Sequence, residues 1–364
     1  MKTKSLKTKI AFVYDWTNKI GGAERILSTL LEIWPEAPLY TSVYSPAKAE
    51  WANNFKVNPS LLNRLPFVRN HHELYPYLLP LSFENFNFQN YDLVISVTSS
   101  FAKGVLTLPK TYSLCYCLTP TRFLWSAYEE YFISSLKRYI SYPVVSYLRH
   151  WDSVAASRPD EYLAISKNVQ ERIKNYYDRD STILYPPVDT SWFTPKRGAP
   201  LDYYLVVSRL VPYKRIDLVV ETFNKNGLPL KIIGTGSQMK RLRKESKNNI
   251  EFLGQLTDKA LLGYYQNCRA LIFPQEEDFG LTPIEAQSCG RPVIAYRRGG
   301  ALETVIEGKT GVFFENQTSE SLQRTIKEFD KLKIKREDCR ENAKRFSKDI
   351  FKQKIIRIVE QKYK

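Results

Sequence analysis

The chain has 364 residues, of which 43% are hydrophobic and 13% aromatic, and its formal net charge is +16. This composition excludes a disordered chain, and the length exceeds what one ordinary core accommodates, so two domains are expected. No apolar run reaches the roughly 18–20 residues needed to span a bilayer. The basic start, "MKTKSLKTKI", leads into a strand pattern instead of the apolar stretch of a signal peptide, which favours a cytoplasmic protein.

The positive charge is spread along the chain. Residues 1–197 contain 23 Lys and Arg against 17 Asp and Glu, and residues 198–364 contain 31 against 21. Such an excess fits nucleic acid, anionic lipid or phosphorylated substrates, or simply a solvated Lys-rich surface. No RNP-type aromatic box, zinc-finger spacing or basic zipper supports nucleic acid. The five cysteines include one close pair and no second pair at zinc spacing, which predicts a reduced chain without a metal site.

Short apolar strands alternate with amphipathic segments in the first half of the chain. The predicted strands are 9–15, 91–97, 111–117 and 161–166, and the predicted helices are 21–34 and 167–177. Two aromatic segments with basic residues at intervals, 65–83 and 128–151, interrupt this order. They have the composition of interfacial membrane segments, or they cover the core of the first domain. The Pro-rich passage 184–200 is typical of a linker.

The alternation restarts in the second half. The predicted strands are 202–210, 230–236, 250–254, 269–274 and 291–296, with helices between them, and two basic helices follow from about residue 335. The expected organisation is an α/β first domain over 1–197, an α/β second domain over 198–345, and a last helix over 346–364 that packs back on the first domain. Parallel sheets of this kind bind ligands at the carboxyl ends of their strands, so a cleft between the two domains is expected.

The stretch "FPQEEDFGLTPIEAQSCGRPVIAYRRGG", from Phe273 to Gly300, concentrates acids near a helix start in a basic protein. Thr282 suits an N-cap, Pro283 the first helical position and Gly290 the end, which predicts a short helix over 283–289. The free amides at its start, from Gly280 to Thr282, would form an anion site.

Two carboxylates flank this predicted anion site. Glu277 precedes the turn, and Glu285 lies eight residues later. Carboxylates accept hydrogen bonds from ribose hydroxyls in dinucleotide sites, so the pair suits a sugar attached to a nucleoside diphosphate. The structural alternatives are a capping box between Thr282 and Glu285, and a plain surface acid at Glu277.

Cations that could neutralise a diphosphate follow the strand 202–210. Arg209 stands at the end of this strand and Lys214 five residues later, whereas Arg215 is expected to face solvent. The alternative is ordinary surface charge. In the first half, Gly21 and Gly22 open a helix after a strand and would let a ligand approach the backbone, or they form a plain turn. The sequence "GTGS" at 234–237 lacks the further residues of a dinucleotide or P-loop motif and indicates a tight turn.

Together these motifs resemble the family 4 retaining glycosyltransferases of GT-B fold. The resemblance covers nearly the whole chain and implies two Rossmann-like, doubly wound domains facing a central cleft. It implies that Glu277 contacts the donor sugar, that Glu285 binds the nucleoside ribose, and that Arg209 and Lys214 neutralise the leaving group. The diphosphate would be held by the turn amides and the glycines of the first domain, namely Phe279, Gly280, Leu281, Thr282, Gly21 and Gly22. Such enzymes usually need no metal.

The segments "YDLVISVTSSFAKGV" and "CYCLTPTRFLWSAYEEY" look like those of the O-antigen mannosyltransferase branch of this family. Leu118 and Ser126 depart from the branch pattern, standing where a His and an Asp are expected. The departures affect the sugar and acceptor assignment and leave the donor-binding half intact. The candidate residues on the acceptor side are Asp15, Ser100, Lys103, Arg122 and Trp125.

The resemblance implies a retaining, metal-independent hexosyltransferase. It would transfer mannose from GDP-mannose to a glycan or lipid-linked acceptor in the biosynthesis of cell-surface polysaccharide or lipopolysaccharide, with no cofactor besides the donor. The alternatives are a UDP-sugar-dependent glycosyltransferase, a nucleotide-sugar 2-epimerase, and a non-catalytic binder of nucleotide sugars. No nucleic-acid partner is expected. The expected location is the cytoplasm, with peripheral attachment to an anionic surface on the inner face of the plasma membrane as the alternative.

Overall fold

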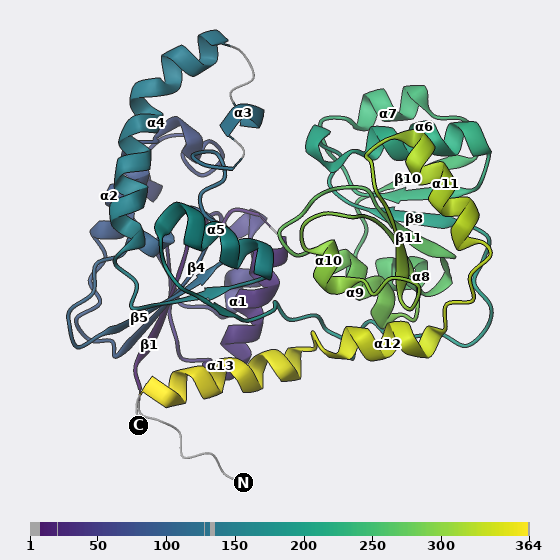
Figure 1. Ribbon diagram of the computed structural model, residues 1–364. Coiled ribbons are helices and arrows are strands. Elements are labelled where there is room, and N and C mark those ends of the chain that lie inside the picture. Colours follow the sequence, from purple (N-terminus) through teal and green to yellow (C-terminus); the bar gives the residue numbers. More distant parts are fainter. Residues whose placement is uncertain (1–7, 20, 127, 132–134, 363–364) are drawn as a thin grey trace. The chain divides into compact units, whose positions relative to one another are not determined.

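A computed structural model describes residues 8–19, 21–126, 128–131 and 135–362 (Figure 1). The contacts between residues divide the chain into two compact units. Unit 1 consists of Met1–Tyr185 and Lys354–Lys364, and unit 2 consists of Pro186–Gln353. The expected domain boundaries after 197 and 345 stay predictions. Most of the basic stretch that begins the sequence, residues 1–7, lies outside the described part.

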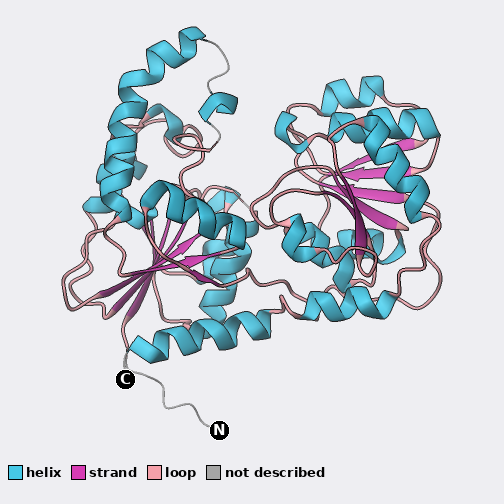
Figure 2. Cartoon of the chain, viewed as in Figure 1, coloured by secondary structure: helices cyan, strands magenta, loops and turns pink. Residues whose placement is uncertain are grey.

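Unit 1 contains a parallel sheet of seven strands in the order β3-β2-β1-β4-β5-β6-β7. The strands are β1 (Ile10–Tyr14), β2 (Leu39–Thr41), β3 (Val57–Pro59), β4 (Leu93–Thr98), β5 (Tyr112–Cys117), β6 (Glu161–Ala164) and β7 (Thr182–Ile183). Every residue of β1 and β4 is buried. Parallel strands covered by helices on both faces are uniformly apolar, and Figure 2 shows this sheet between helices.

The helices of unit 1 connect these strands. They are α1 (Gly22–Ile33), α2 (Leu78–Glu84), α3 (Tyr128–Tyr131), α4 (Ser135–Ala156) and α5 (Lys167–Tyr177), with the short 3-10 turns η1 (Pro46–Lys48), η2 (Glu50–Asn54), η3 (Leu61–Arg64), η4 (His72–Leu74) and η5 (Ala102–Gly104). The aromatic segment 65–83 forms η4, all but the last residue of α2, and turns, and most of 128–151 lies in α4. Residues 132–134 of the second segment lie outside the described part.

Unit 2 contains a parallel sheet of six strands in the order β10-β9-β8-β11-β12-β13. The strands are β8 (Tyr204–Val207), β9 (Leu230–Ile233), β10 (Ile250–Gly254), β11 (Ala270–Phe273), β12 (Val293–Tyr296) and β13 (Gly311–Phe314). The helices are η6 (Pro212–Lys214), α6 (Ile216–Asn226), α7 (Met239–Glu245), α8 (Asp258–Asn267), α9 (Leu281–Ser288), α10 (Ala301–Thr304), α11 (Ser319–Phe329) and α12 (Arg336–Lys344). Helix α13 (Lys348–Lys362) ends in the part assigned to unit 1.

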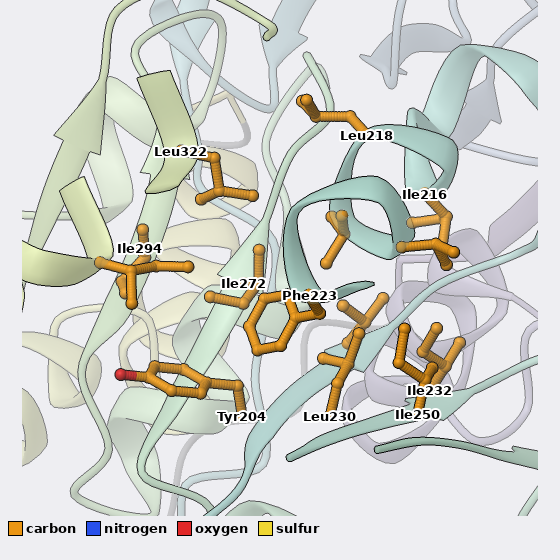
Figure 3. Close-up of a cluster of buried hydrophobic side chains, with 14 of the residues drawn as sticks. Tyr204, Ile216, Leu218, Phe223, Leu230, Ile232, Ile250, Ile272, Ile294 and Leu322 are labelled. Carbon is orange, nitrogen blue, oxygen red and sulfur yellow. The ribbon is translucent and has the colours of Figure 1, made fainter. Parts of the chain in front are cut away.

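The core of unit 2 forms where α6 packs on the sheet. Figure 3 shows Phe223 of α6 directed at side chains of the strands, among them Ile272 and Leu230. The rings of Phe223 and Tyr204 meet edge to face with their centroids 5.4 Å apart. Phe223 is fully buried, because α6 carries its apolar side chains on the face turned to the sheet.

The fold class predicted from the sequence is confirmed: both units contain parallel sheets wound with helices. The chain ends in two helices, α12 and α13, as predicted. Only α13 has an excess of Lys and Arg over Asp and Glu, whereas α12 has three of each, so the prediction that both are basic is wrong for α12. The linker prediction for 184–200 is wrong from Pro186 onward. Phe193 is buried in unit 2, and the Arg340 guanidinium donates hydrogen bonds to the carbonyl oxygens of Phe193 at 2.8 Å and Thr190 at 2.7 Å.

The order of the strands reverses direction at one place in each sheet. In unit 1 the chain builds outward from β1 to β3 and returns to add β4 on the other side of β1. In unit 2 the same reversal separates β8 from β11. Helices leave such neighbouring strands in opposite directions, which opens a crevice at their carboxyl ends. These two positions are therefore where a ligand site is expected.

All five cysteines, 115, 117, 268, 289 and 339, are free thiols and buried. Burial raises the pKa of Cys117 well above its usual value, despite the nearby Lys103. It raises the pKa of Cys268 and of Cys339 to about 12. Such thiols are protonated and unreactive at neutral pH.

Candidate functional site

The reversal point of unit 2 brings together the cations and the acid that the sequence singled out. Arg209 and Lys214 follow β8, and Glu277 follows the neighbouring strand β11. The backbone of Arg215 lies in the left-handed region, at φ 53°, and ends η6 so that α6 can begin at the next residue. Lys214 is thereby buried, with only 8% of its surface exposed.

Lys214 and Glu277 form an ion pair between the Lys214 ammonium and the Glu277 Oε1 atom. The Glu277 side chain is 26% exposed, so the pair lies at the surface of the crevice and not in the core. Burial alone would raise the pKa of Glu277. The charge of Lys214, hydrogen bonds from Lys214 and Gln275, and the charge of Arg209 outweigh burial and lower it. Glu277 is therefore a carboxylate at neutral pH, able to accept hydrogen bonds from hydroxyl groups.

Arg209 lies on the same crevice and is exposed. Its guanidinium donates a hydrogen bond to the Tyr213 hydroxyl at 2.5 Å, and its charge acts on Glu277. Arg215 turns elsewhere: its guanidinium contacts the side chain and the carbonyl of Gln317, at 3.3 and 3.4 Å, and Asp217 at 3.6 Å. The expectation that Arg215 faces solvent is met only in part, because about a third of its side chain is exposed.

Gln275 is a site residue that the sequence reasoning missed. It is buried, it follows β11 by two residues, and its amide nitrogen donates a hydrogen bond to Glu277 Oε1 at 3.0 Å. Its Oε1 atom is buried with no hydrogen-bond partner among the described residues. Its position at the carboxyl end of a strand is the signal that could have identified it.

Helix α9 begins two residues earlier than predicted. Its first residue is Leu281 and its N-cap is Gly280, so the prediction of Thr282 as N-cap and a helix over 283–289 is wrong in its start. Gly280 has φ 87°, a conformation that glycine adopts freely and other residues rarely do. This turn redirects the chain before Thr282 is reached. A capping box between Thr282 and Glu285 is therefore excluded, because Thr282 lies inside the helix.

Glu285 is buried on α9, with 3% of its surface exposed. The Tyr265 hydroxyl of α8 donates a hydrogen bond to its Oε2 atom at 2.7 Å. Tyr265 itself is fully buried. The carboxylate is thus oriented by a fixed donor.

Two further glycines, Gly299 and Gly300, pack against the loop between β11 and α9. The Gly300 amide donates to the Glu277 carbonyl oxygen at 2.8 Å. A Cβ atom on Gly300 would stand 2.3 Å from Phe279 Cα, and one on Gly299 would stand 2.4 Å from the Glu277 carbonyl oxygen. The "RRGG" sequence after β12 therefore fixes the loop that carries Glu277, Phe279 and Gly280.

In unit 1 the reversal point is organised around Asp15, which follows β1 and is buried. Its Oδ1 atom accepts hydrogen bonds from the Thr98 hydroxyl and the amides of Phe101 and Ala102, at 2.8–2.9 Å. Its Oδ2 atom accepts from the Ser99 amide at 2.7 Å. Both oxygens of Asp15 thus hold the loop after β4 in place, whatever further role the residue has.

Lys103 and Trp125 both bind the buried carboxylate of Asp152 in α4, a residue that the sequence analysis missed. The Lys103 ammonium lies 2.5 Å from Asp152 Oδ1, and both side chains are buried. Further hydrogen bonds to Asp152 come from Thr121 Oγ1, Trp125 Nε1 and the Tyr177 hydroxyl, each at 2.8 Å. Asp152 belongs to no recognisable motif, and only the fold brings it here. The network ties α4, α5 and the loops after β4 and β5 together.

The other candidate residues of unit 1 lie around these networks. Ser100 is buried and its hydroxyl has no hydrogen-bond partner among the described residues, while Arg122 is half-buried. Gly21 is the N-cap of α1, and Gly21 and Gly22 are exposed. The roles of all these residues in binding remain predictions. Leu118 is half-buried and Ser126 exposed, so neither supplies a buried polar group in place of the expected His and Asp.

Part of the chain is similar in sequence to known glycosyltransferases. Residues 195–346 match the family model described as Glycosyl transferases group 1. The chain is 26% identical over 220 residues to an uncharacterised glycosyltransferase of Methanocaldococcus jannaschii, covering 59% of this chain and 62% of that protein. It is 27% identical over 187 residues to the O-antigen chain mannosyltransferase C of Escherichia coli, covering 47% and 46%. The matches span less than two thirds of the length of these relatives.

Solved structures match nearly the whole chain. The Anabaena protein HepE in complex with UDP and glucose has a TM-score of 0.73 at 18% identity, covering 97% of this chain and 99% of that one. Sucrose-phosphate synthase from Thermosynechococcus elongatus has a TM-score of 0.75 at 16% identity, covering 98% and 99%. The two parallel-sheet units thus have the GT-B architecture of these glycosyltransferases, as predicted.

Two searches of the described residues bear on metals and membranes. No group of three or more His, Cys, Asp or Glu side chains placed to hold a metal ion occurs among them. Within the same residues, no helix has both the length and the apolar character needed to cross a bilayer. Metal independence and location remain predictions.

Proposed function

We propose that the protein is a retaining glycosyltransferase that transfers mannose from GDP-mannose to a glycan or lipid-linked acceptor in cell-surface polysaccharide synthesis. The observation that carries the proposal is the Lys214–Glu277 pair beside the glycine-initiated start of α9, at the reversal point of the unit 2 sheet. Cations and amides suit the diphosphate, and carboxylates suit the hydroxyls of the sugars at either end.

In the proposed reaction, negative charge develops on the departing diphosphate as its bond to the anomeric carbon breaks. Arg209, Lys214 and the amides at the start of α9 would stabilise that charge, without requiring a metal. Glu277 would orient the donor sugar and Glu285 the ribose. The acceptor hydroxyl would attack from the face that the diphosphate leaves and pass its proton to the departing diphosphate. The configuration at the anomeric carbon is then retained, and no enzymatic nucleophile is needed.

The choice of mannose rests on relatives. Besides the E. coli protein, a GDP-mannose-dependent phosphatidylinositol monomannoside mannosyltransferase of Corynebacterium glutamicum is 29% identical over 193 residues, covering 44% of this chain and 50% of that one. The second candidate is a UDP-sugar donor. It is favoured by HepE, which was solved with UDP, with UDP-glucose, and with UDP and glucose.

A thermal-shift panel tests the proposal. GDP-mannose, GDP, UDP-glucose and UDP are added to the full chain, and a ligand at 100 times its Kd should add about 2.7 kcal/mol of stability. A shift with the GDP ligands alone supports the proposal, and a shift with the UDP ligands alone supports the second candidate. If no nucleotide sugar shifts the transition, the proposal is wrong.

Product analysis separates the remaining alternatives. Incubation with the stabilising nucleotide sugar and no acceptor should yield no 2-epimer, whereas a 2-epimerase would produce one. Binding without transfer to any glycan or lipid acceptor would indicate a non-catalytic binder.

We further propose peripheral attachment to an anionic membrane surface, on the basis of the net charge and the exposed apolar side chains of unit 1.

A further inference from the structure

Unit 1 contains an apolar pocket that no part of the proposed donor chemistry uses. It has a volume of about 460 Å³, within the range of small-molecule sites. Three aromatic side chains form one side of it: Trp16, Phe101 and Phe123. These residues follow β1, β4 and β5, so the pocket opens at the carboxyl edge of the sheet, beside the reversal point between β1 and β4.

Helices α2 and α4 form the opposite side of the pocket. Leu79 of α2 and Val144, Val145 and Leu148 of α4 line it. The Tyr77 and Tyr147 rings lie 5.3 Å apart, and both are exposed. They follow and precede the lining residues Pro76 and Leu148 in the chain, so exposed aromatic side chains adjoin residues of the pocket wall.

Two of the three polar residues that line the pocket, His72 and Glu73, form one rim, and the third, Ser141, lies on the α4 wall. The His72 ring is tilted against that of Trp16 with ring centroids 4.4 Å apart, and Glu73 carboxylate oxygens lie 3.4 Å from His71 and 3.7 Å from His72. Burial lowers the pKa of His72, against the opposing charge of Glu73. The exposed Lys19 places its ammonium 5.5 Å from the centre of the Trp16 ring, on this same rim.

The two units thus present chemically different edges to a ligand. In unit 2 the crevice carries Arg209, Lys214, Gln275 and Glu277, which suit a sugar nucleotide. In unit 1, Asp15 and Asp152 accept hydrogen bonds from groups of unit 1 itself, and apolar side chains form most of the pocket wall. A free sugar or an inorganic phosphate would find no hydrogen-bond partners deep in such a pocket, whereas an aliphatic chain would gain from burial.

We propose that this pocket binds the first part of the aliphatic chain of a phosphate-bearing lipid acceptor, with the phosphate at the rim near Lys19. The inference deepens the proposed function and rests on it for the identification of the ligand as an acceptor. Lys19 supplies charge complementarity for the phosphate, and the exposed Tyr77 and Tyr147 rings beside the pocket wall accommodate the rest of the chain.

Alkyl phosphates test the pocket directly. Inorganic phosphate, octyl phosphate and dodecyl phosphate are titrated into the full chain by calorimetry, below their micelle concentrations and without donor. Each buried methylene should tighten binding about 4-fold until the pocket is filled. Inorganic phosphate should not bind measurably. Equal affinities for octyl and dodecyl phosphate would overturn the proposal.

Variants locate the binding site. Val144→Trp, at a half-buried wall position, should fill the pocket and weaken dodecyl phosphate binding on the order of 10-fold or more, because an overfilled pocket expels the chain. Ser141→Trp, on the same wall, replaces Val144→Trp if circular dichroism shows that the first variant does not fold. The matched control is Leu81→Trp, which lines a different apolar hollow of unit 1, of about 430 Å³, and should leave binding unchanged.

Three outcomes would contradict the proposal. In the first, folded Val144→Trp and Ser141→Trp bind dodecyl phosphate as the natural chain does. In the second, Leu81→Trp loses binding and the pocket variants keep it. In the third, the natural chain is a dimer that either pocket variant dissociates. The last outcome would make a second copy the occupant. Failure here is distinct from failure of the proposed function. If nucleotide sugars stabilise the chain but dodecyl phosphate does not bind, only the pocket proposal is wrong. If dodecyl phosphate binds but no nucleotide sugar stabilises the chain, the proposed function is wrong and so is the identification of the ligand as an acceptor, whereas the pocket still binds an aliphatic chain.

Discussion

At the scale of single residues, the Lys214–Glu277 pair joins two segments that lie 63 positions apart in sequence. Sequence reasoning identified both residues because each follows an apolar strand. It could not pair them, because which strands are neighbours is decided by the order in the sheet. Gln275 was missed for a related reason: an amide between a proline and an acid has no motif, and its contact with Glu277 exists only in the folded loop.

Removing either member of this pair should abolish sugar transfer and leave the fold intact. Glu277→Ala removes the acceptor for the sugar hydroxyls, and Lys214→Ala removes a cation from the leaving group. Loss of one such electrostatic contact is typically worth about 10²–10³-fold in turnover. Transfer of radiolabelled sugar measures the effect, and Arg215→Ala, which alters a neighbouring cation bonded to Gln317, is the control. Near-normal turnover of either variant would show that the site is misassigned.

The Glu277 carboxylate also predicts how stability depends on pH. Its pKa is lowered from the usual 4.5 in the folded chain. Its contribution to stability is therefore complete above the usual pKa and is lost as the pH falls through the lower folded value. Denaturant unfolding of the natural chain and of Glu277→Gln should differ most near neutral pH and converge on acidification. A difference that grows toward low pH would contradict this assignment.

The buried Lys103–Asp152 pair should be costly to break from one side. Lys103→Met leaves the Asp152 carboxylate buried without its cation, which typically destabilises a protein by about 3–5 kcal/mol. The double variant Lys103→Met with Asp152→Leu removes both charges and should recover part of the loss, although Thr121, Trp125 and Tyr177 then lose an acceptor. Urea unfolding, monitored by tryptophan fluorescence, measures the stability of both variants. A double variant less stable than the sum of the single ones would refute this account.

At the scale of elements, the long buried strands and amphipathic helices were predictable from periodicity. Helix α5 and strand β10 have the predicted bounds, 167–177 and 250–254. The strands β2, β3 and β7 were missed, since three or fewer residues carry too little pattern. Strand β13 was missed despite its apolar sequence "GVFF", because it is only four residues long and begins with a glycine. Strand order, which creates the two reversal points, has no local signal at all.

The start of α9 depends on one glycine. In Gly280→Ala the new Cβ would lie 2.8 Å from the Phe273 ring at a φ of 87°, so we expect a loss of about 1–3 kcal/mol and weakened nucleotide-sugar binding. Gly227→Ala is the matched control, because Gly227 also has positive φ, 71°, but nothing lies within 4 Å of its Cβ position. Thermal unfolding and ligand shifts compare the two. Equal losses in both would mean that contact with Phe273 is unimportant.

At the scale of the whole molecule, unit 1 exposes apolar side chains on a chain whose net charge is positive. Tyr139 and Ile140 of α4 are 82% and 67% exposed, and the chain carries a net charge of +16. Flotation should show binding to anionic vesicles and weaker binding to zwitterionic ones, with release at high salt. Tyr139→Ser with Ile140→Ser should reduce it. Absence of salt-sensitive binding would count against membrane attachment.

Each unit has its own hydrophobic core, and α13 belongs partly to each. The core of unit 1 gathers Val94, Phe83 and Trp151, and that of unit 2 gathers Phe223, Ile272 and Ile294. Near its end α13 places Lys362 3.0 Å from Glu161 of unit 1. Each unit is therefore stabilised by its own core, and α13 contains residues of both units.

The five buried thiols give each unit its own built-in reporter of opening. Cys115 and Cys117 lie in unit 1, and Cys268, Cys289 and Cys339 lie in unit 2. A thiol-labelling reagent can modify them only after local or global exposure. Mass-resolved labelling over time would then read the opening rate of each half of the chain separately, with no introduced label and no engineered cysteine.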